Sequence, residues 1–549
     1  MALELLSWTT PWKPSGSPII RRDLGPHRVA LDPFEIVRHP VDQDMGVAPE
    51  VLYAQSSSPS FDAVSRSLAS VIGSTAPSNR GLCNDSRKVS RFGRCLVVID
   101  RMRARVLYTF LVIGAGKLLM SIRSPKLSAA EIRKGHAWYP YYAGYSVGFV
   151  EDTLSRLALS AHSTVLDPWN GSGTTTFVAR KQAYTAVGFD LNPALVLVAK
   201  GRLLDGNVLA SLPALTSDII KKARDHRKKP SHSIPEPLTR WFVDKTAVDF
   251  RAIDQAVSEL LINSDHYEPL FTLKQLSSIS SLAAFYYVAL FRTVRSFLGG
   301  FRTTNPTWIK SAKSPEDRLE INRRTITARF RESVAHLSNH IAHNGGTESQ
   351  NGDYCRIEPA TSEALPIQSD SVDAVLGSPP YCTRIDYPIA TLPELSILGC
   401  GDKCDLKKLR DTMIGTPTIR SEFSKTSADW GQTCLRFLKN VKSHPSKASD
   451  TYYSTYFVQY FASLWNSLSE LDRVLRPGAP CALVVQDSYY KEVHNNLPRI
   501  VTEMARSHGW ELQDRMNFKV VRTKASMHEK SRRYRSDFKA TESLLLFRH

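Results

Sequence analysis

The chain has 549 residues, 42% of them hydrophobic, and its formal net charge at pH 7 is +18. This length allows two or three domains with a buried core, and the composition excludes a mainly disordered chain. The positive surplus favours an anionic partner, most commonly a nucleic-acid backbone, although charge spread evenly over the surface would give the same total.

The cysteines and the apolar segments indicate the compartment in which we expect the protein. Eight scattered cysteines are too few for a disulfide framework, which favours a reducing compartment. Cys400 and Cys404 form a close pair, but no second pair or histidine cluster lies nearby, so we expect no metal site. The N-terminus shows no signal-peptide pattern, and the most apolar stretch, 106–122, is short for a membrane span and contains Lys117. We therefore expect a cytoplasmic protein that makes no membrane contact.

The first 200 residues divide into an irregular and a regular part. Residues 1–125 contain runs rich in proline and serine, so we treat them as an accessory or disordered extension. Residues 126–202 show the alternation of a Rossmann-like sheet, and we expect them to form its cofactor-binding half. The predicted elements are a helix over 147–159, a strand over 162–168, a helix over 174–181 and a strand over 184–190.

The remaining chain divides into a helical and a second α/β part. Residues 203–350 are predicted to form a mainly helical insertion, with helices over 247–262, 282–298 and 324–342. Residues 351–549 resume the sheet and are expected to form its catalytic half. Their predicted strands cover 354–360, 371–377, 479–487, 510–521 and 542–549, with helices over 454–474 and 497–509. This alternation favours a three-layer α/β sandwich.

The first candidate motif is a glycine-rich turn, Asp167-Pro-Trp-Asn-Gly-Ser-Gly-Thr-Thr175, between the first strand and its helix. Gly171 and Gly173 allow a sharp turn and a close approach of the backbone to a ligand. The turn has neither the lysine of a phosphate-binding loop nor the spacing of a dinucleotide site. Asp190 ends the second strand, where a carboxylate can accept hydrogen bonds from ribose hydroxyls. The alternative is that Asp190 caps the helix that starts at Pro193.

The second candidate motif is Ser378-Pro-Pro-Tyr381, directly after the predicted strand over 371–377. Two consecutive prolines fix the backbone and remove its donors, which leaves carbonyl acceptors held in place for an amino group. Tyr381 offers a flat ring on which a flipped-out base can stack. A proline turn that merely ends a strand is the alternative, but the combination with the glycine-rich turn argues against it.

Together the two motifs resemble those of the S-adenosylmethionine-dependent amino-methyltransferases that modify DNA at cytosine N4 or adenine N6. The segment that starts at His136 and runs to Ser146 is similar to the upstream cofactor motif of that family, and 371–387 and 470–479 are similar to family phrases. The resemblance covers about 130–202 and 353–549. It departs from the family at Trp169, where phenylalanine is usual, and at Thr361 and Ser362, where an acid often contacts adenine.

The resemblance implies a class I methyltransferase sheet, in which 203–350 would serve as a target-recognition or lid region, and it assigns roles to individual residues. In this family the glycine turn holds the methionine part of the cofactor, the acid after the second strand binds ribose, and the proline turn grips the target amino group. The expected catalytic residues are Ser378, Pro379, Pro380 and Tyr381. The expected cofactor-binding residues are Tyr142, Asp167, Pro168, Trp169, Gly171, Gly173, Thr174, Asp190 and Asn192. No covalent nucleophile is expected, because the amine attacks the sulfonium directly.

A basic segment, 515–539, contains interleaved aromatic residues and falls between the last two predicted strands. Its cations could neutralise DNA phosphates, and a solvated hairpin loop is the alternative. The expected nucleic-acid contacts are Arg384, Lys524, Lys530, Arg532, Arg533 and Arg535.

The sequence therefore predicts a site-specific methyltransferase acting on double-stranded DNA with the target base flipped out. Serine at the head of the second motif favours cytosine N4 over adenine N6 within the family. The resemblance also implies a prokaryotic setting, either with a cognate restriction endonuclease or as a solitary enzyme. An RNA base methyltransferase and an inactive nucleic-acid-binding scaffold are the alternatives.

Overall fold

The computed structural model describes residues 121–126, 138–141, 144–228, 236–262, 267–271, 276–303, 308–344, 354–383, 385–401, 403–420, 425–520 and 540–549. All of them belong to one of two compact units, Ile99–His549; the other, Met1–Val98, lies outside the described residues. The predicted extension over 1–125 therefore falls almost entirely outside them.

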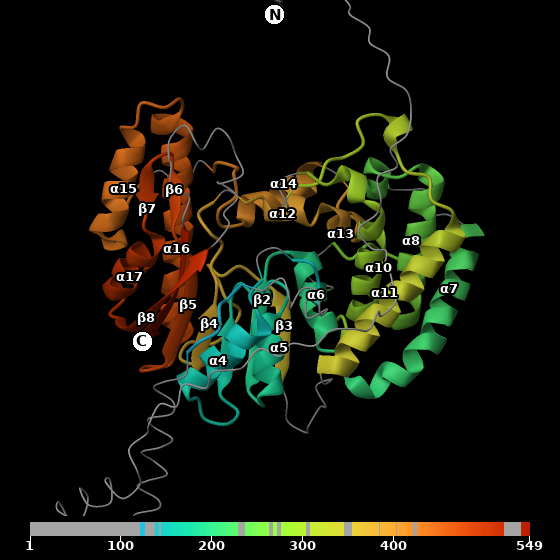
Figure 1. The fold of residues 1–549 in the computed structure, drawn as a ribbon, viewed down its shortest axis with the longest axis horizontal. Helices are drawn as coiled ribbons and strands as arrows, with labels where there is room; N and C mark the ends of the chain where they lie inside the picture. Colours follow the sequence, from blue (N-terminus) through green and yellow to red (C-terminus); the bar gives the residue numbers. More distant parts are fainter. Residues whose placement is uncertain are drawn as a thin grey trace, which may run out of the picture. The chain divides into compact units, whose positions relative to one another are not determined.

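A seven-stranded mixed sheet forms the centre of the described unit, with the strand order β3-β2-β1-β4-β5-β9-β8 (Figure 1). The strands from β3 to β5 in this order run parallel, whereas β9 is antiparallel to both β5 and β8. The α/β architecture expected from the alternating pattern is thus confirmed. The strands are β1 (Thr164–Asp167), β2 (Thr185–Asp190), β3 (Cys355–Pro359), β4 (Ala374–Gly377), β5 (Pro480–Gln486), β8 (Glu511–Val520) and β9 (Ala540–Arg548).

Alternate residues of the central strands face two separate hydrophobic cores, as the period of a strand requires. On β1, Val165 belongs to one core and Leu166 to the other; on β4, Leu376 and Val375 divide in the same way. The first core is covered by α4 (Val147–Leu157), α5 (Thr174–Lys181) and α6 (Pro193–Arg202). The second is covered by α15 (Gln432–Lys442), α16 (Ser454–Val474) and α17 (Leu497–Ser507). The predicted three layers are present because both faces of the sheet are apolar.

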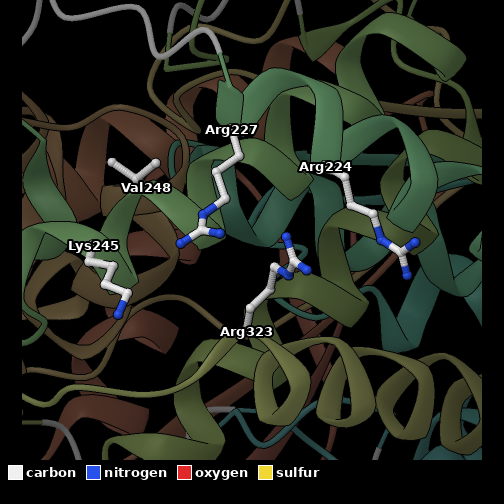
Figure 2. Close-up of a pocket in the computed structure, with 5 residues that line it drawn as sticks. All are labelled: Arg224, Arg227, Lys245, Val248 and Arg323. Carbon is white, nitrogen blue, oxygen red and sulfur yellow. The ribbon is translucent and has the colours of Figure 1, made fainter.

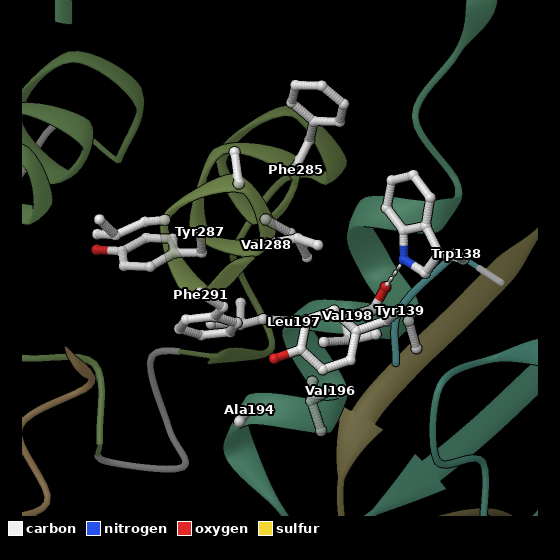
Figure 3. Packing of buried hydrophobic residues seen from close by; sticks show 14 of the residues in the cluster. Trp138, Tyr139, Ala194, Val196, Leu197, Val198, Phe285, Tyr287, Val288 and Phe291 are labelled. Atoms are coloured by element: carbon white, nitrogen blue, oxygen red, sulfur yellow. Dashed lines mark hydrogen bonds between the residues drawn. The ribbon is translucent and has the colours of Figure 1, made fainter. Parts of the chain in front are cut away.

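Residues 203–344 are mainly helical where they are described. The long ones are α7 (Leu212–Lys228), α8 (Asp244–Leu261), α10 (Ser281–Phe297) and α11 (Arg323–Asn344). Helix α10 packs against α6, α8 and α11, which explains why nearly all of its apolar side chains are buried. Figure 3 shows this core, in which Trp138 donates a hydrogen bond to the Val198 carbonyl of α6 at 2.8 Å. The helical segment is therefore attached to the sheet through α6.

Several elements have no counterpart among the predicted ones. These are α15, the helices α12 (Tyr387–Ala390), α13 (Leu392–Ile397) and α14 (Lys403–Thr412), and the hairpin of β6 (Ser488–Tyr490) and β7 (Val493–Asn495). The short helical turns are η1 (Gly206–Ser211), η2 (Pro237–Arg240), η3 (Gly299–Phe301), η4 (Pro315–Asp317), η5 (Ala428–Trp430) and η6 (Ser449–Tyr453). Within the described ranges, no helix combines the length and apolar character that crossing a membrane requires.

Candidate active site

The glycine-rich turn and the Ser-Pro-Pro-Tyr turn follow neighbouring strands. β1 and β4 pair directly, and the chain proceeds outward in opposite directions from them, to β2 on one side and β5 on the other. In an open α/β sheet such a switch point forms a crevice at the carboxyl ends of the strands, where ligands bind. Both motifs lie at this edge, although about 200 residues separate them in the sequence.

Gly377, the last residue of β4, shows how closely the two turns approach. A Cβ atom at Gly377 would lie 3.1 Å from Asp167 Oδ1, 3.1 Å from Trp169 Cε3 and 3.2 Å from Pro168 Cδ. These distances are tighter than ordinary van der Waals contact, so a side chain there would push the turns apart. The absence of a side chain at Gly377 thus lets the first turn pack against the residue that precedes Ser378.

The two glycines of the first turn have backbone conformations that L-residues rarely adopt. Gly171 has φ of 51° and Gly173 has φ of 74°. A Cβ at Gly173 would lie only 2.7 Å from the Ala199 Cβ, so this glycine also allows α5 to approach α6. A Cβ at Gly171 would lie 3.1 Å from the Tyr141 ring. Gly171 therefore borders the candidate site, whereas Gly173 mainly allows α5 and α6 to pack closely.

Asp167 is almost completely buried and stabilises the turn through hydrogen bonds. Its carboxylate accepts hydrogen bonds from the Trp169 backbone N–H at 3.0 Å, the Thr175 hydroxyl at 2.6 Å and the Tyr145 hydroxyl at 2.9 Å. Burial raises the pKa of Asp167 to about 6, against the effect of these donors. Tyr145 lies inside the upstream motif but was not among the predicted site residues.

Asp190 stands at the end of β2 and faces the same turn. Its carboxylate accepts hydrogen bonds from the backbone N–H groups of Gly171 at 2.9 Å and Asn192 at 2.8 Å. Burial is the main cause that raises the pKa of Asp190 to about 6. The cap of α6 is Asn192 and not Asp190, because the Asn192 side chain accepts from the Ala194 N–H. The alternative interpretation, in which Asp190 caps the helix that starts at Pro193, is therefore wrong.

The other predicted cofactor residues lie around the turn with defined partners. Asn192 is fully buried, and its amide donates to the Thr391 hydroxyl at 2.7 Å. Thr174 accepts from the buried Arg202 at 3.0 Å. Trp169 donates through its indole N–H to the Ser362 hydroxyl at 2.9 Å, which joins the turn to the segment after β3. The side chains of Asn192 and Thr174 are therefore engaged within the chain.

Three neighbouring elements hold the Ser-Pro-Pro-Tyr turn. The Ser378 hydroxyl donates to the Val484 carbonyl of β5 at 3.0 Å, and the Tyr460 hydroxyl of α16 donates to the Pro380 carbonyl at 2.8 Å. The Tyr381 hydroxyl donates to Glu542 of β9. Burial raises the pKa of Tyr381 well above its ordinary value, so this hydroxyl is a donor at neutral pH. The turn is rigid because each of these contacts comes from a different element.

Glu542 is the main feature of the site that the sequence reasoning missed. It is 4% exposed, and its Oε2 atom has no hydrogen-bond partner among the described residues. Burial raises the pKa of this carboxyl, while the Tyr381 hydroxyl and Lys126 oppose the rise. The available signal was an acid in a predicted strand, just before the apolar run of Leu544 to Phe547. A buried carboxylate therefore lies beside the tyrosine that was predicted to meet the base.

Several predicted residues cannot be placed. The predicted cofactor residue Tyr142 and the predicted nucleic-acid contacts Arg384, Lys524, Lys530, Arg532, Arg533 and Arg535 lie outside the described residues. The neighbour of Tyr142, Tyr141, borders Gly171, and its pKa is raised by burial and by the nearby Tyr387 and Asp190. Among the described residues, no group of three or more His, Cys, Asp or Glu side chains is arranged to hold a metal ion.

Known proteins similar to this chain are methyltransferases. No protein-family model matches the chain. The type II methyltransferase M.AvaI of a Nostoc species is 21% identical over 423 residues, which cover 72% of this chain and 83% of that protein. The type II methyltransferase M.BsoBI of Geobacillus stearothermophilus is 24% identical over 298 residues, which cover 51% of this chain and 55% of that protein. The chain is therefore a distant homologue of type II methyltransferases.

Proposed function

We propose that the chain is a site-specific DNA methyltransferase that transfers a methyl group from S-adenosylmethionine to an exocyclic amino group of a base. The observation that carries the proposal is the packing of the Asp167-Pro168-Trp169 turn against Gly377. This packing brings the glycine-rich turn, to which we assign the cofactor, next to the Ser-Pro-Pro-Tyr turn, to which we assign the target amino group, at the switch point of the sheet. The type II methyltransferase relatives support the same reaction and DNA as the substrate.

The residues at the first turn fit S-adenosylmethionine. Asp190 has two backbone donors, and its remaining lone pairs can accept hydrogen bonds from the ribose hydroxyls. The buried Asp167 and the partly buried Asp190 bring two carboxylates to the turn, and their charge suits the cationic methionine part of this cofactor. When bound, the cofactor supplies an electrophilic methyl group on its sulfonium.

The second turn would hold the amine. Because Tyr460 already binds the Pro380 carbonyl, the carbonyls of Ser378 and Pro379 are the acceptors that we assign to the incoming amino group. Hydrogen bonds from the amine to these acceptors would direct its lone pair and increase its nucleophilicity. The Tyr381 ring would stack on the flipped base, an interaction worth about 1–3 kcal/mol per base. Positioning and electrostatics would supply the catalysis, without a covalent nucleophile.

The finer assignments are extensions of this proposal. The serine at position 378 favours cytosine N4 over adenine N6, on the resemblance described above. The same resemblance suggests a restriction partner or a solitary role and a cytoplasmic location. An RNA base methyltransferase is the second candidate, and a nucleic-acid-binding scaffold without activity is the third.

Two substitutions test the site assignment by calorimetric titration with S-adenosylmethionine and by methyl transfer to DNA. Asp190→Ala should weaken cofactor binding about tenfold or more, because hydrogen bonds to a charged group contribute about 1.5–3 kcal/mol. Tyr381→Ala should bind the cofactor nearly as well as the unchanged chain but lose most methyl transfer. Tyr354→Ala, at an exposed tyrosine, is the matched control and should change neither. Full activity of both site variants would refute the assignment.

A further inference from the structure

A second charged site lies between three helices of the helical segment. A cavity of about 560 Å³ is lined by Arg224 and Arg227 of α7, Lys245 and Val248 of α8, and Arg323 of α11. Figure 2 shows these side chains surrounding the pocket. None of them belongs to the site at the ends of β1 and β4. We call this cavity the basic pocket.

The charges of the basic pocket are only partly compensated. Asp249, which is almost completely buried behind it, pairs with Arg227 at 2.7 Å. Glu320 lies 3.6 Å from Lys245, but both side chains are 68% exposed, so solvent screens this pair. Arg323 forms no salt bridge with another described residue, but its charge also acts on Asp249, whereas Arg224 has no salt-bridge partner among the described residues. Two carboxylates thus face four cations, and the surplus favours a bound anion.

The composition of the pocket distinguishes it from an ordinary small-molecule site. Such sites are lined mainly by apolar and aromatic side chains, whereas Val248 is the one apolar residue that lines this pocket. Three of the four cations are arginines, whose planar fork matches two phosphate oxygens at once. Lys245 lies in the first turn of α8, where Asp244 offsets the helix dipole, so the positive charge of the pocket comes from its side chains. The pocket therefore has the chemistry of a phosphate receptor.

We propose that the basic pocket binds backbone phosphates of duplex DNA. Arg224, Lys245 and Arg323 are exposed at its rim and Arg227 is half-buried, so the cations are accessible to a macromolecular backbone as well as to a free ion. The choice of DNA as the polyanion rests on the proposed function. The pocket would position the duplex through its backbone and would add no sequence specificity of its own.

The test compares two double variants of the full-length chain that lose the same charge from the same two helices. Arg224→Gln with Arg323→Gln removes two pocket cations. Lys221→Gln with Arg324→Gln is the control, because both residues are exposed on α7 and α11 and neither lines the pocket. Fluorescence anisotropy measures the affinity for a labelled duplex between about 50 and 200 mM salt, and circular dichroism checks that both variants fold.

Loss of two phosphate contacts should lower the slope of log affinity against log salt by about 1.8. Across this fourfold range of salt, the affinity of the pocket variant should therefore fall about tenfold less than that of the unchanged chain. The control variant should keep the original slope. Equal slopes for the two double variants would overturn the proposal.

Two further arms separate the remaining outcomes. If tripolyphosphate raises the melting temperature of the unchanged chain but not of the pocket variant, while both bind DNA alike, the site takes small anions and the proposal is wrong. Methyl transfer by the unchanged chain is measured in parallel. If the pocket variant has a lowered salt slope but the unchanged chain transfers no methyl group, the basic pocket binds DNA phosphates and the proposed function is wrong. If the unchanged chain transfers methyl groups but the pocket variant keeps the original salt slope, the proposed function holds and the proposal for the basic pocket is wrong.

Discussion

The hydrogen bond between Tyr381 and Glu542 fixes the ring that we expect to meet the target base. Glu542 comes from β9, and its position opposite Gln486 of β5 places it at the carboxyl end of the parallel strands. A tyrosine side chain held in this way cannot rotate freely, so it loses less conformational entropy when a base stacks on it. Glu542 is therefore a positioning residue in the proposed reaction.

Substitutions at Tyr381 and Glu542 should show coupled effects on single-turnover methyl transfer. Glu542→Ala and Tyr381→Phe each remove the hydrogen bond and should each slow transfer about tenfold, which corresponds to about 1.4 kcal/mol. The double variant should be little slower than either single one, because both remove the same interaction. Glu542→Gln keeps an acceptor and should lose less. Losses that multiply in the double variant would mean that the two residues act independently.

The buried carboxyls of Asp167 and Asp190 predict that cofactor binding depends on pH. Each has a pKa of about 6 in the folded chain against an ordinary value of 3.8, so the folded state retains protons that the unfolded chain releases. These groups therefore destabilise the fold increasingly as pH rises from about 4 to about 6. Cofactor binding needs the ionised forms, so affinity should weaken as pH falls below about 6.

Calorimetry at pH 5.5 and 7.5, in buffers of different ionisation enthalpy, checks this prediction. The unchanged chain should release protons on binding at pH 5.5 and should bind more weakly there than at pH 7.5. Asp190→Asn should bind more weakly at both values but show a smaller dependence on pH. An affinity that is the same at both values would contradict the assignment of these carboxyls to the cofactor.

At the scale of elements, the contact between α5 and α6 depends on a single glycine. The substitution Gly173→Ala would have two unfavourable effects. It would place an alanine in a left-handed backbone conformation and a Cβ only 2.7 Å from the Ala199 Cβ. The two effects together should reduce the free energy of unfolding by about 2–4 kcal/mol, measured by urea denaturation. Gly300→Ala is the control, because nothing lies within 4 Å of a Cβ there. Equal stability of the two variants would show that the loop relaxes freely.

The elements themselves were largely predictable where the local pattern is strong. The strand over 184–190 and the helices over 174–181 and 454–474 correspond to β2, α5 and α16. An apolar run bounded by turn residues and, in α16, an apolar helical period are local signals. The hairpin of β6 and β7 and the short helix α12 were missed, since strands of three residues and a single helical turn depend on tertiary contacts.

Prediction of the site was more uneven for the same reason. The two turns are visible as sequence motifs, but the strand order that places β1 beside β4 was not among the predictions and is known from the fold. Glu542 could not be assigned, because its role depends on β9 running antiparallel beside β5 and on the fold of a turn about 160 residues away. Arg224 and Arg323 belong to basic segments, but only the packing of α7 against α8 and α11 brings them to one pocket.

At the scale of the whole molecule, the central claim is that this chain methylates a base amino group in DNA. The most direct measurement uses labelled S-adenosylmethionine with unmethylated genomic DNA and, in parallel, with RNA. The products are digested to nucleosides and identified by mass. We predict N4-methylcytosine from DNA; N6-methyladenine would preserve the reaction but correct the base. Label in RNA alone, or no label in either despite demonstrated cofactor binding, would contradict the claim.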